Sequence, residues 1–329
     1  MIYRFFLVTC LVMPFVTLES RAQGAPPADV YFRYFAFDGE RNPIFCLPID
    51  SAAGLPRCYG VDYDSAGRPI QVTQLFFGNF NSRADWTIMK FRYNTLSSGS
   101  VAVARTWHGA GGIPVQIGFA YGEVVLYDST DRLIMYTATD KNGNRVERVN
   151  GVTRSIFRTR DENTFIQEWR YSNNKQYSGS EPDIWNSQFA FLDNRAWFRV
   201  FKIDDNGFVL EEQALDLAKR PVMFPGGEGI RQYERNECGQ VLSVRFATQD
   251  GSPMEDSSGV ARIDYSYDEA GRMVEWVATD LSGKLKGRIE FAGAARMSRT
   301  YRSFDGRLLR EQFFDAEGNL IELQEKLEG

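Results

Sequence analysis

The segments Tyr63-Asp64-Ser65-Ala66-Gly67-Arg68 and Tyr267-Asp268-Glu269-Ala270-Gly271-Arg272 decide the fold, because they repeat one turn sequence 204 residues apart. In such a segment the aspartate can accept backbone N–H hydrogen bonds, and the glycine can adopt the positive φ that a tight turn requires. We expect the tyrosine to pack on the neighbouring unit and the arginine to pair with acids on adjacent strands. Structural turns are therefore expected at Asp64, Gly67, Asp268 and Gly271.

The glycine of this motif marks a repeat that runs along most of the chain. Equivalent positions are Gly67, Gly99, Asp131, Asn163, Gly207, Gly239, Gly271 and Gly306, and the steps between them are 32, 32, 32, 44, 32, 32 and 35 residues. A second turn position follows each anchor by 11 or 12 residues, and six of its eight places hold glycine. Two offsets that agree on one period indicate about eight repeats. Further turns are expected at Gly207, Gly239 and Gly306.

Strands are expected between the turns, because apolar and polar residues alternate there. Leu242, Val244 and Phe246 alternate with Ser243 and Arg245, as in a half-buried strand. We predict an all-β fold, an antiparallel meander of about eight two-stranded repeats that forms a curved or coiled sheet. A closed β-propeller or barrel-like ring is the alternative, since a long open sheet must curl, split or close to protect its edges.

The N-terminus has the features of a cleavable signal peptide. Arg4 precedes the apolar stretch 5–16, and Ala22-Gln23-Gly24 offers small residues for cleavage after Gly24. We therefore predict a signal peptide over 1–24, an N-terminal segment with a first degenerate repeat over 25–60, and the repeat array over 61–329. This organisation predicts a periplasmic or secreted protein with no transmembrane segment in the mature chain. An uncleaved membrane anchor is the alternative.

Charge and cysteine content narrow the functions further. Removing residues 1–24 leaves a net charge of −6, and the basic residues are scattered, which argues against nucleic-acid binding. In an oxidising compartment Cys46 and Cys58 can close a small loop and leave Cys238 unpaired; three buried thiols are the alternative. His108 is the single histidine of the sequence, and no Cys/His pairing suggests zinc. We expect no metal site and no cofactor.

The two hexapeptides, with the degenerate Tyr127–Arg132, resemble the YD repeats of the RHS family. That resemblance implies a β-strand repeat protein of bacterial surfaces or toxin systems, whose long arrays can form a shell around a toxic cargo. The array of this chain is short and its period of 32 is longer than that of YD units. We expect no toxin domain.

Two segments resemble catalytic or metal-binding motifs but are better explained as turns. Trp107–Gly112 contains a His-Gly run of the kind found in oxyanion holes, but no Gly-x-Ser-x-Gly accompanies it. Asp140–Asn144 gathers oxygen ligands, yet Arg145 and Gly151 stand where an EF-hand needs glycine and an acid. We therefore assign no catalytic residue.

The 44-residue step contains an insertion of 12 residues, expected near 172–188. Tyr171, Tyr177 and Trp185 stand there among polar residues and are the candidate partner-binding residues, since insertions on a repeat scaffold often lie on its functional face. The alternative is a loop that covers the sheet edge with its aromatic side chains packed inward.

These observations favour an exported, non-enzymatic β-repeat scaffold that binds a protein partner or a cell-envelope or extracellular glycan. Two alternatives stay open. One is a carboxylate-dependent, glycan-active enzyme, which requires two carboxylates across a cleft. The other is a component of an RHS-like surface or toxin system, which rests on the resemblance alone.

Overall fold

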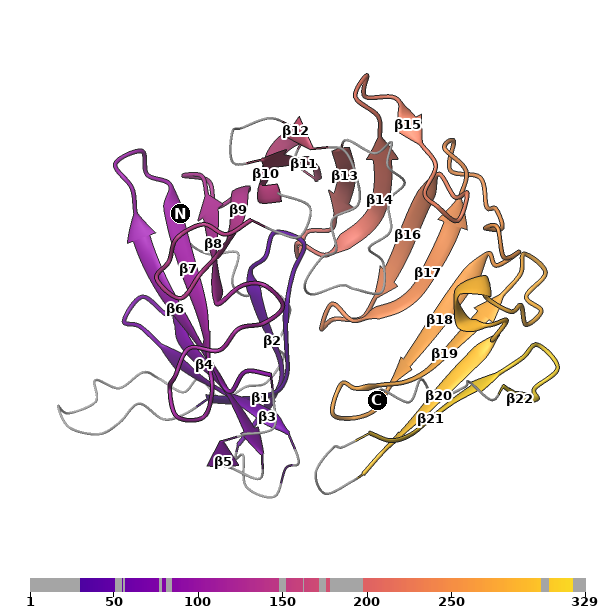
Figure 1. The fold of residues 1–329 in the computed structure, drawn as a ribbon, viewed down its shortest axis with the longest axis horizontal. Coiled ribbons are helices and arrows are strands. Elements are labelled where there is room, and N and C mark those ends of the chain that lie inside the picture. The colour runs from indigo at the N-terminus through magenta and orange to yellow at the C-terminus, as the bar shows by residue number, and fades with distance from the viewer. Residues whose placement is uncertain are drawn as a thin grey trace.

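The protein is an all-β repeat sheet bent into an open arc (Figure 1). A computed structural model describes residues 30–50, 55, 57–76, 79–80, 85–147, 152–161, 163–171, 176–177, 198–302 and 308–321. The predicted signal peptide over 1–24 lies outside this range. Within the described residues, 22 strands form one antiparallel meander, which confirms the predicted curved sheet. None of the helical segments described there is long and apolar enough to cross a membrane.

The elements of the first half are β1 (Val30–Phe37), β2 (Pro43–Ile49), β3 (Cys58–Tyr63), β4 (Pro69–Phe76), β5 (Asn79–Phe80), β6 (Ile88–Thr95), β7 (Val101–His108), β8 (Gly122–Tyr127), β9 (Leu133–Thr139), β10 (Val152–Asp161), β11 (Thr164–Tyr171) and β12 (Gln176–Tyr177). Those of the second half are β13 (Phe198–Ile203), β14 (Val209–Leu215), β15 (Pro221–Val222), β16 (Ile230–Arg235), β17 (Val241–Ala247), β18 (Arg262–Tyr267), β19 (Met273–Thr279), the short 3₁₀ helix η2 (Ile289–Phe291), β20 (Arg296–Tyr301), β21 (Leu308–Phe314) and β22 (Leu320–Ile321). Among the described strands, no pairing joins β2 at one end of the sheet to β21 or β22 at the other.

One turn geometry recurs along the array. The Asp64 Oδ1 atom accepts the backbone N–H groups of Ala66 and Arg68, each at 2.9 Å, while Gly67 takes a φ of 74°. This is a type I turn closed by a left-handed residue, which explains the Asp-x-x-Gly spacing. The same pair of amide bonds forms at Asp128, Asp140, Asp204, Asn236, Asp256, Asp268, Asp280 and Asp315.

The other anchor glycines have matching backbones where the structure describes them. Gly207, Gly239 and Gly271 have φ angles of 81°, 76° and 72°. Gly306 lies outside the described residues. The expectation for the arginine was wrong, because the guanidinium returns to its own turn: Arg272 Nε and Nη2 lie 2.7 and 2.6 Å from Asp268 Oδ2. Its other contact is with the next unit, where it lies over the ring of Tyr301 at 4.6 Å.

Tyrosine hydroxyls join successive units. The hydroxyl of Tyr267 donates to the carbonyl of Val241 at 2.9 Å, and that of Tyr301 donates to the carbonyl of Met273 at 3.1 Å. Each acceptor lies two residues after the anchor glycine of the preceding unit. The period of the sequence is thus also the period of a hydrogen bond between units.

A β-bulge follows most of the anchor turns. In β18–β19, for example, Ser266 pairs with Glu275 and Tyr267 pairs with Met273, so Val274 is the extra residue. The same register shift occurs in five other hairpins, where the extra residue is Ile70, Ile134, Leu210, Leu242 or Leu309. Bulges bend a strand and increase its twist. Because they recur at one place in the repeat, their bends add up to the arc, and they interrupt the simple alternation expected at Leu242.

The β1–β2 hairpin reaches into the opening of the arc, as Figure 1 shows. At its tip the N–H of Gly39 donates to the carbonyl of Gly207 at 2.8 Å, which joins it to the fifth anchor turn. Next to this contact, the Glu123 carboxylate accepts hydrogen bonds from Arg41 and Arg105, each at 2.8 Å. Glu123 and Arg105 are both 1% exposed, so paired, hydrogen-bonded charges hold the tip.

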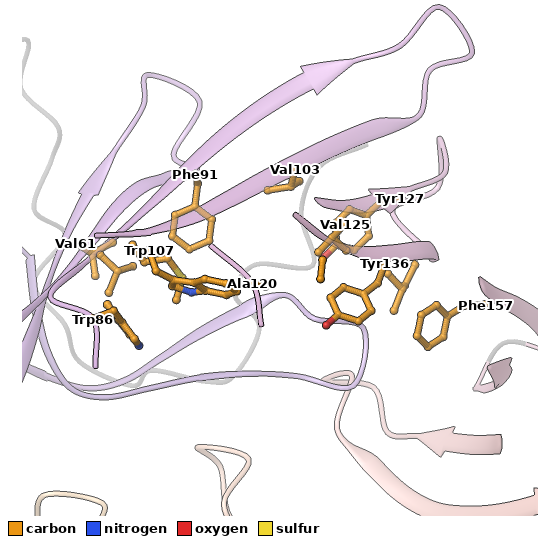
Figure 2. Packing of buried hydrophobic residues seen from close by; sticks show 14 of the residues in the cluster. Val61, Trp86, Phe91, Val103, Trp107, Ala120, Val125, Tyr127, Tyr136 and Phe157 are labelled. Atoms are coloured by element: carbon orange, nitrogen blue, oxygen red, sulfur yellow. The ribbon is translucent and has the colours of Figure 1, made fainter. Parts of the chain in front are cut away.

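Clusters of buried side chains fill the arc, and two of them are large. The first lies between β1–β2 and β3–β11 and includes Trp107 and Val125, both fully buried (Figure 2). Aromatic residues of the hairpin pack against it, namely Phe32, Phe35, Phe37 and Phe45. The second cluster centres on Trp276 and Ile263 and is covered by loop residues of its own units, including Phe291. The N-terminal hairpin is therefore needed for the first cluster.

The predicted disulfide between Cys46 and Cys58 is wrong. The bridge joins Cys46 to Cys238, with a Cα–Cα distance of 5.6 Å, and Cys58 is a buried free thiol. The reason is strand order: β1 lies between β2, which carries Cys46, and β3, which carries Cys58. Two inter-strand spacings amount to roughly 10 Å, beyond the ~7 Å that a disulfide can span. Burial raises the pKa of the Cys58 thiol to about 11.

We predict that Asp268→Ala lowers the free energy of unfolding by about 1–3 kcal/mol, because two turn amides and Arg272 lose their acceptor. Asp268→Asn retains the Oδ1 acceptor, as Asn236 does in its own turn, and should cost clearly less. Urea unfolding of the three proteins measures the difference. Equal losses in both variants would contradict the role of Oδ1.

A second prediction concerns Asp38 at the hairpin tip. Burial raises the pKa of its carboxyl from 3.8 to about 7, against the opposing effect of hydrogen bonds from Asn42. The folded state therefore holds this proton more tightly than the unfolded state, so the stability contribution is complete below pH 4 and is lost as pH rises to about 7. Asp38→Asn should stabilise the protein more at about pH 8 than at about pH 4.5. Unfolding midpoints at both values test this, and a gain that is the same at both would refute it.

Candidate anion-binding pocket

A cavity of about 280 Å³ lies where the N-terminal strands meet the seventh repeat unit. One wall comes from β1 and the start of β3, and the other comes from the turn 268–272 and the end of β20. Its charged and aromatic lining consists of Arg33, Tyr34, Phe35, Arg57, Tyr59, Arg272 and Tyr301. Segments far apart in sequence thus converge on one site. Among the described residues that line it are three arginines and no carboxylate.

Two of these arginines hold buried N–H groups without a protein acceptor. Arg272 uses Nε and Nη2 to bind Asp268, which leaves Nη1 buried with no partner among the described residues. Arg57 donates from Nη2 to the Tyr59 hydroxyl at 2.5 Å, and its Nε is likewise buried with no partner there. An unmet buried donor costs free energy, and a charged one costs more. Donors of this kind suit an oxyanion.

Two of the tyrosines pack against the arginines, and Tyr34 supplies a neutral hydroxyl group. Arg57 lies over the ring of Tyr59 at 5.4 Å, and Arg272 lies over the ring of Tyr301. Burial, reinforced by the nearby Tyr267 and Tyr59 hydroxyls, raises the pKa of Tyr34 to about 12. Tyr34 therefore stays protonated at neutral pH and can donate a hydrogen bond to an anion.

Three contacts hold the two walls together. Tyr34 packs so closely on Gly271 that a Cβ atom there would lie 2.8 Å from Cδ2 of the ring. The Gln240 side chain donates from Nε2 to the carbonyl of Gly271 at 3.0 Å. The disulfide joins Cys238, in the same turn as Gln240, to Cys46, which lies opposite Tyr34 in the β1–β2 register. The pocket therefore depends on contacts between distant parts of the chain.

The structure does not describe the side chains of the partner-binding candidates in the insertion. Tyr171 ends β11, and Tyr177 in β12 pairs through its backbone with Trp169. The side chains of Tyr171 and Tyr177, and all of Trp185, fall outside the described residues, so these three stay predictions.

The catalytic-looking His-Gly segment forms a turn. The His108 ring lies 2.9 Å from Thr106 Oγ1 through Nε2 and 3.0 Å from the Gly112 carbonyl through Nδ1. Both ring nitrogens are thus engaged locally. Within the described residues, no group of three or more His, Cys, Asp or Glu side chains is placed to hold a metal ion.

Sequence reasoning missed the pocket residues. Arg272 belongs to the repeat motif, so its sequence context indicates a turn and nothing more. Arg33 and Tyr34 lie in an aromatic-rich strand whose sequence indicates a strand but no binding role. The signal that could have found them is the density of arginine and tyrosine in two segments that the arc later brings together.

Comparison with known proteins gives the chain no family. No protein-family model matches it, and no curated protein does. A solved structure with some similarity is a protein of unknown function from Bacteroides caccae, with 11% sequence identity over 77% of this chain and 94% of that one. The TM-score of 0.15 is too low for this similarity to inform the fold or the site.

We predict that Gly271→Ala destabilises the protein more than Gly283→Ala does. Both glycines have a positive φ, 72° and 82°, so both substitutions carry about 1–2 kcal/mol of backbone strain. At Gly283 an added methyl group would meet no atom within 4 Å, whereas the methyl group at 271 must displace Tyr34. The difference, about 1–3 kcal/mol, is measurable by urea unfolding. An equal loss of unfolding free energy in both variants would show that the packing of Tyr34 on Gly271 does not hold the two walls together.

Proposed function

We propose that the protein is an exported, non-enzymatic β-repeat scaffold that binds an anionic glycan of the cell envelope or extracellular space. The observation that carries the proposal is a buried guanidinium N–H group on each of Arg57 and Arg272 that has no acceptor among the described residues. A carboxylate or sulfate ester placed in the cavity would accept hydrogen bonds from the guanidinium groups of Arg57 and Arg272, and it would share Arg272 with Asp268, which already pairs with it. Export rests on the signal peptide predicted over 1–24.

The pocket is a local cationic site in an acidic chain. The net charge of the whole sequence is −5, so the protein as a whole repels polyanions at long range. An anion is therefore recognised by short-range hydrogen bonds inside the pocket, which favours selective binding over general polyanion attraction.

The size and lining of the cavity favour a sugar. Small-molecule pockets span roughly 300–1,000 Å³, so a cavity of about 280 Å³ suits one anionic residue of a polymer. The faces and hydroxyls of Tyr34, Tyr59 and Tyr301 combine apolar contact with polar ends, which matches a sugar ring. A protein partner would insert an acidic side chain instead, and such a ligand is the competing outcome of the test.

We predict that Arg57→Gln and Arg272→Gln each weaken binding of oligogalacturonate by at least tenfold in calorimetric titration, because each removes a charged donor. The matched control is Arg68→Gln. Arg68 makes the same contacts with Asp64 and lies over Tyr93 at 4.5 Å, yet it does not line the pocket.

Two results would refute the proposed ligand class. One is equal affinity for a neutral cello-oligosaccharide, and the other is an equal loss of affinity in Arg68→Gln. Chondroitin sulfate distinguishes a sulfate ester from a carboxylate, and an acidic peptide represents the protein partner. New reducing ends during incubation with the uronate would instead favour the carboxylate-dependent enzyme.

A further inference from the structure

The wall of the pocket formed by the seventh unit is attached to the N-terminal wall through a short chain of contacts. The first of these contacts is the disulfide between Cys46 in β2 and Cys238. The chain of contacts continues within the turn 236–240 to Gln240, whose side chain holds the carbonyl of Gly271. Gly271 is followed by Arg272, so a single side-chain hydrogen bond separates the turn that holds Cys238 from the residue whose Nη1 has no acceptor among the described residues.

No strand pairing provides this connection in the part of the chain that the structure describes. β1 pairs with β2 and β3, whereas β19 pairs with β18 and β20. The strands next to the two walls pack into different buried clusters, one around Trp107 and the other around Trp276, and Val209 contacts both. We therefore expect each half to keep most of its core when the link between the walls is cut.

We infer that the redox state of the Cys46–Cys238 bond controls ligand binding in the pocket, an inference that rests on the proposed function. A dithiol reductant breaks the S–S bond and supplies two electrons and two protons, which yields two protein thiols and the cyclic disulfide of the reductant. The turn 236–240 then loses its tether to β2. Gln240 and Gly271 move with this turn. The guanidinium of Arg272 then moves away from the pocket that it lines together with Arg57.

The remaining thiol does not interfere with this step. Cys58 is fully buried, and burial raises its pKa, so it has little thiolate with which to attack the bridge. Cys46 is half-buried and Cys238 is 7% exposed, so we expect a reductant to reach the bond from the Cys46 side. The hairpin tip stays in place through Gly39 and the charges around Glu123.

The test compares the oxidised full chain, the same chain in dithiothreitol, and the double variant Cys46→Ser with Cys238→Ser. Hydrogen exchange is followed in residues 236–240 and 268–272 and in the strands β6–β8 and β17–β19, and oligogalacturonate affinity is measured in parallel. Gln240→Ala is a milder variant that cuts the chain of contacts one step further on. Dithiothreitol added to the double variant is the control for effects of the reductant.

Reduction is expected to speed exchange in both turns by at least tenfold, to leave the strands protected, and to weaken binding by at least tenfold. Gln240→Ala should speed exchange in 268–272 while the disulfide is intact. Unchanged exchange and affinity on reduction would overturn the inference. Loss of protection throughout β17–β19 would also overturn it, since the disulfide would then stabilise the whole fold and not the pocket wall in particular. If the oxidised chain binds no anionic glycan, the proposed function fails, and exchange alone decides whether the bridge controls the wall.

Discussion

The structure depends on one small interaction, a side-chain oxygen that accepts the amides two and four residues further along the chain. At Asp64 and Asp268 it fixes the turn, and the left-handed glycine then returns the strand in register. The bulge that follows most of these turns bends each hairpin in the same sense. A local hydrogen-bond pattern, repeated at one period, thereby sets the curvature of the whole sheet.

Curvature in turn creates a space that the N-terminal hairpin fills. Its four phenylalanines complete the first core, and Arg41 meets Glu123 and Arg105 at the point where the tip crosses the array. The base of the same hairpin faces the seventh unit and forms the pocket. Core formation and the candidate site are therefore two consequences of one placement.

The sequence predicted the parts of the fold that are local and repeated. The Asp-x-x-Gly spacing predicted the turns, and the alternation around Val244 and Phe246 predicted strands. It did not predict the bulge at Leu242, because an extra residue leaves no mark in a list of apolar positions. The disulfide and the pocket were missed for a different reason: both depend on which strand lies between β2 and β3 and on which units the arc brings together, and neither is encoded at short range.

The position of the cysteines has a consequence for how the chain acquires its bridge. Cys46 is 12 residues from Cys58 and 192 residues from Cys238. In an unfolded chain the entropy of loop closure favours the shorter ring by about 2.5 kcal/mol. Loop closure therefore favours a local, incorrect Cys46–Cys58 bond in the unfolded chain, and this bond is incompatible with the position of β1 between β2 and β3. The native bond forms from it when the Cys238 thiolate attacks the sulfur of Cys46 and releases Cys58 as a thiolate, before β1 takes its place between the two strands. An isomerase that accelerates this exchange would raise the yield of correctly paired protein.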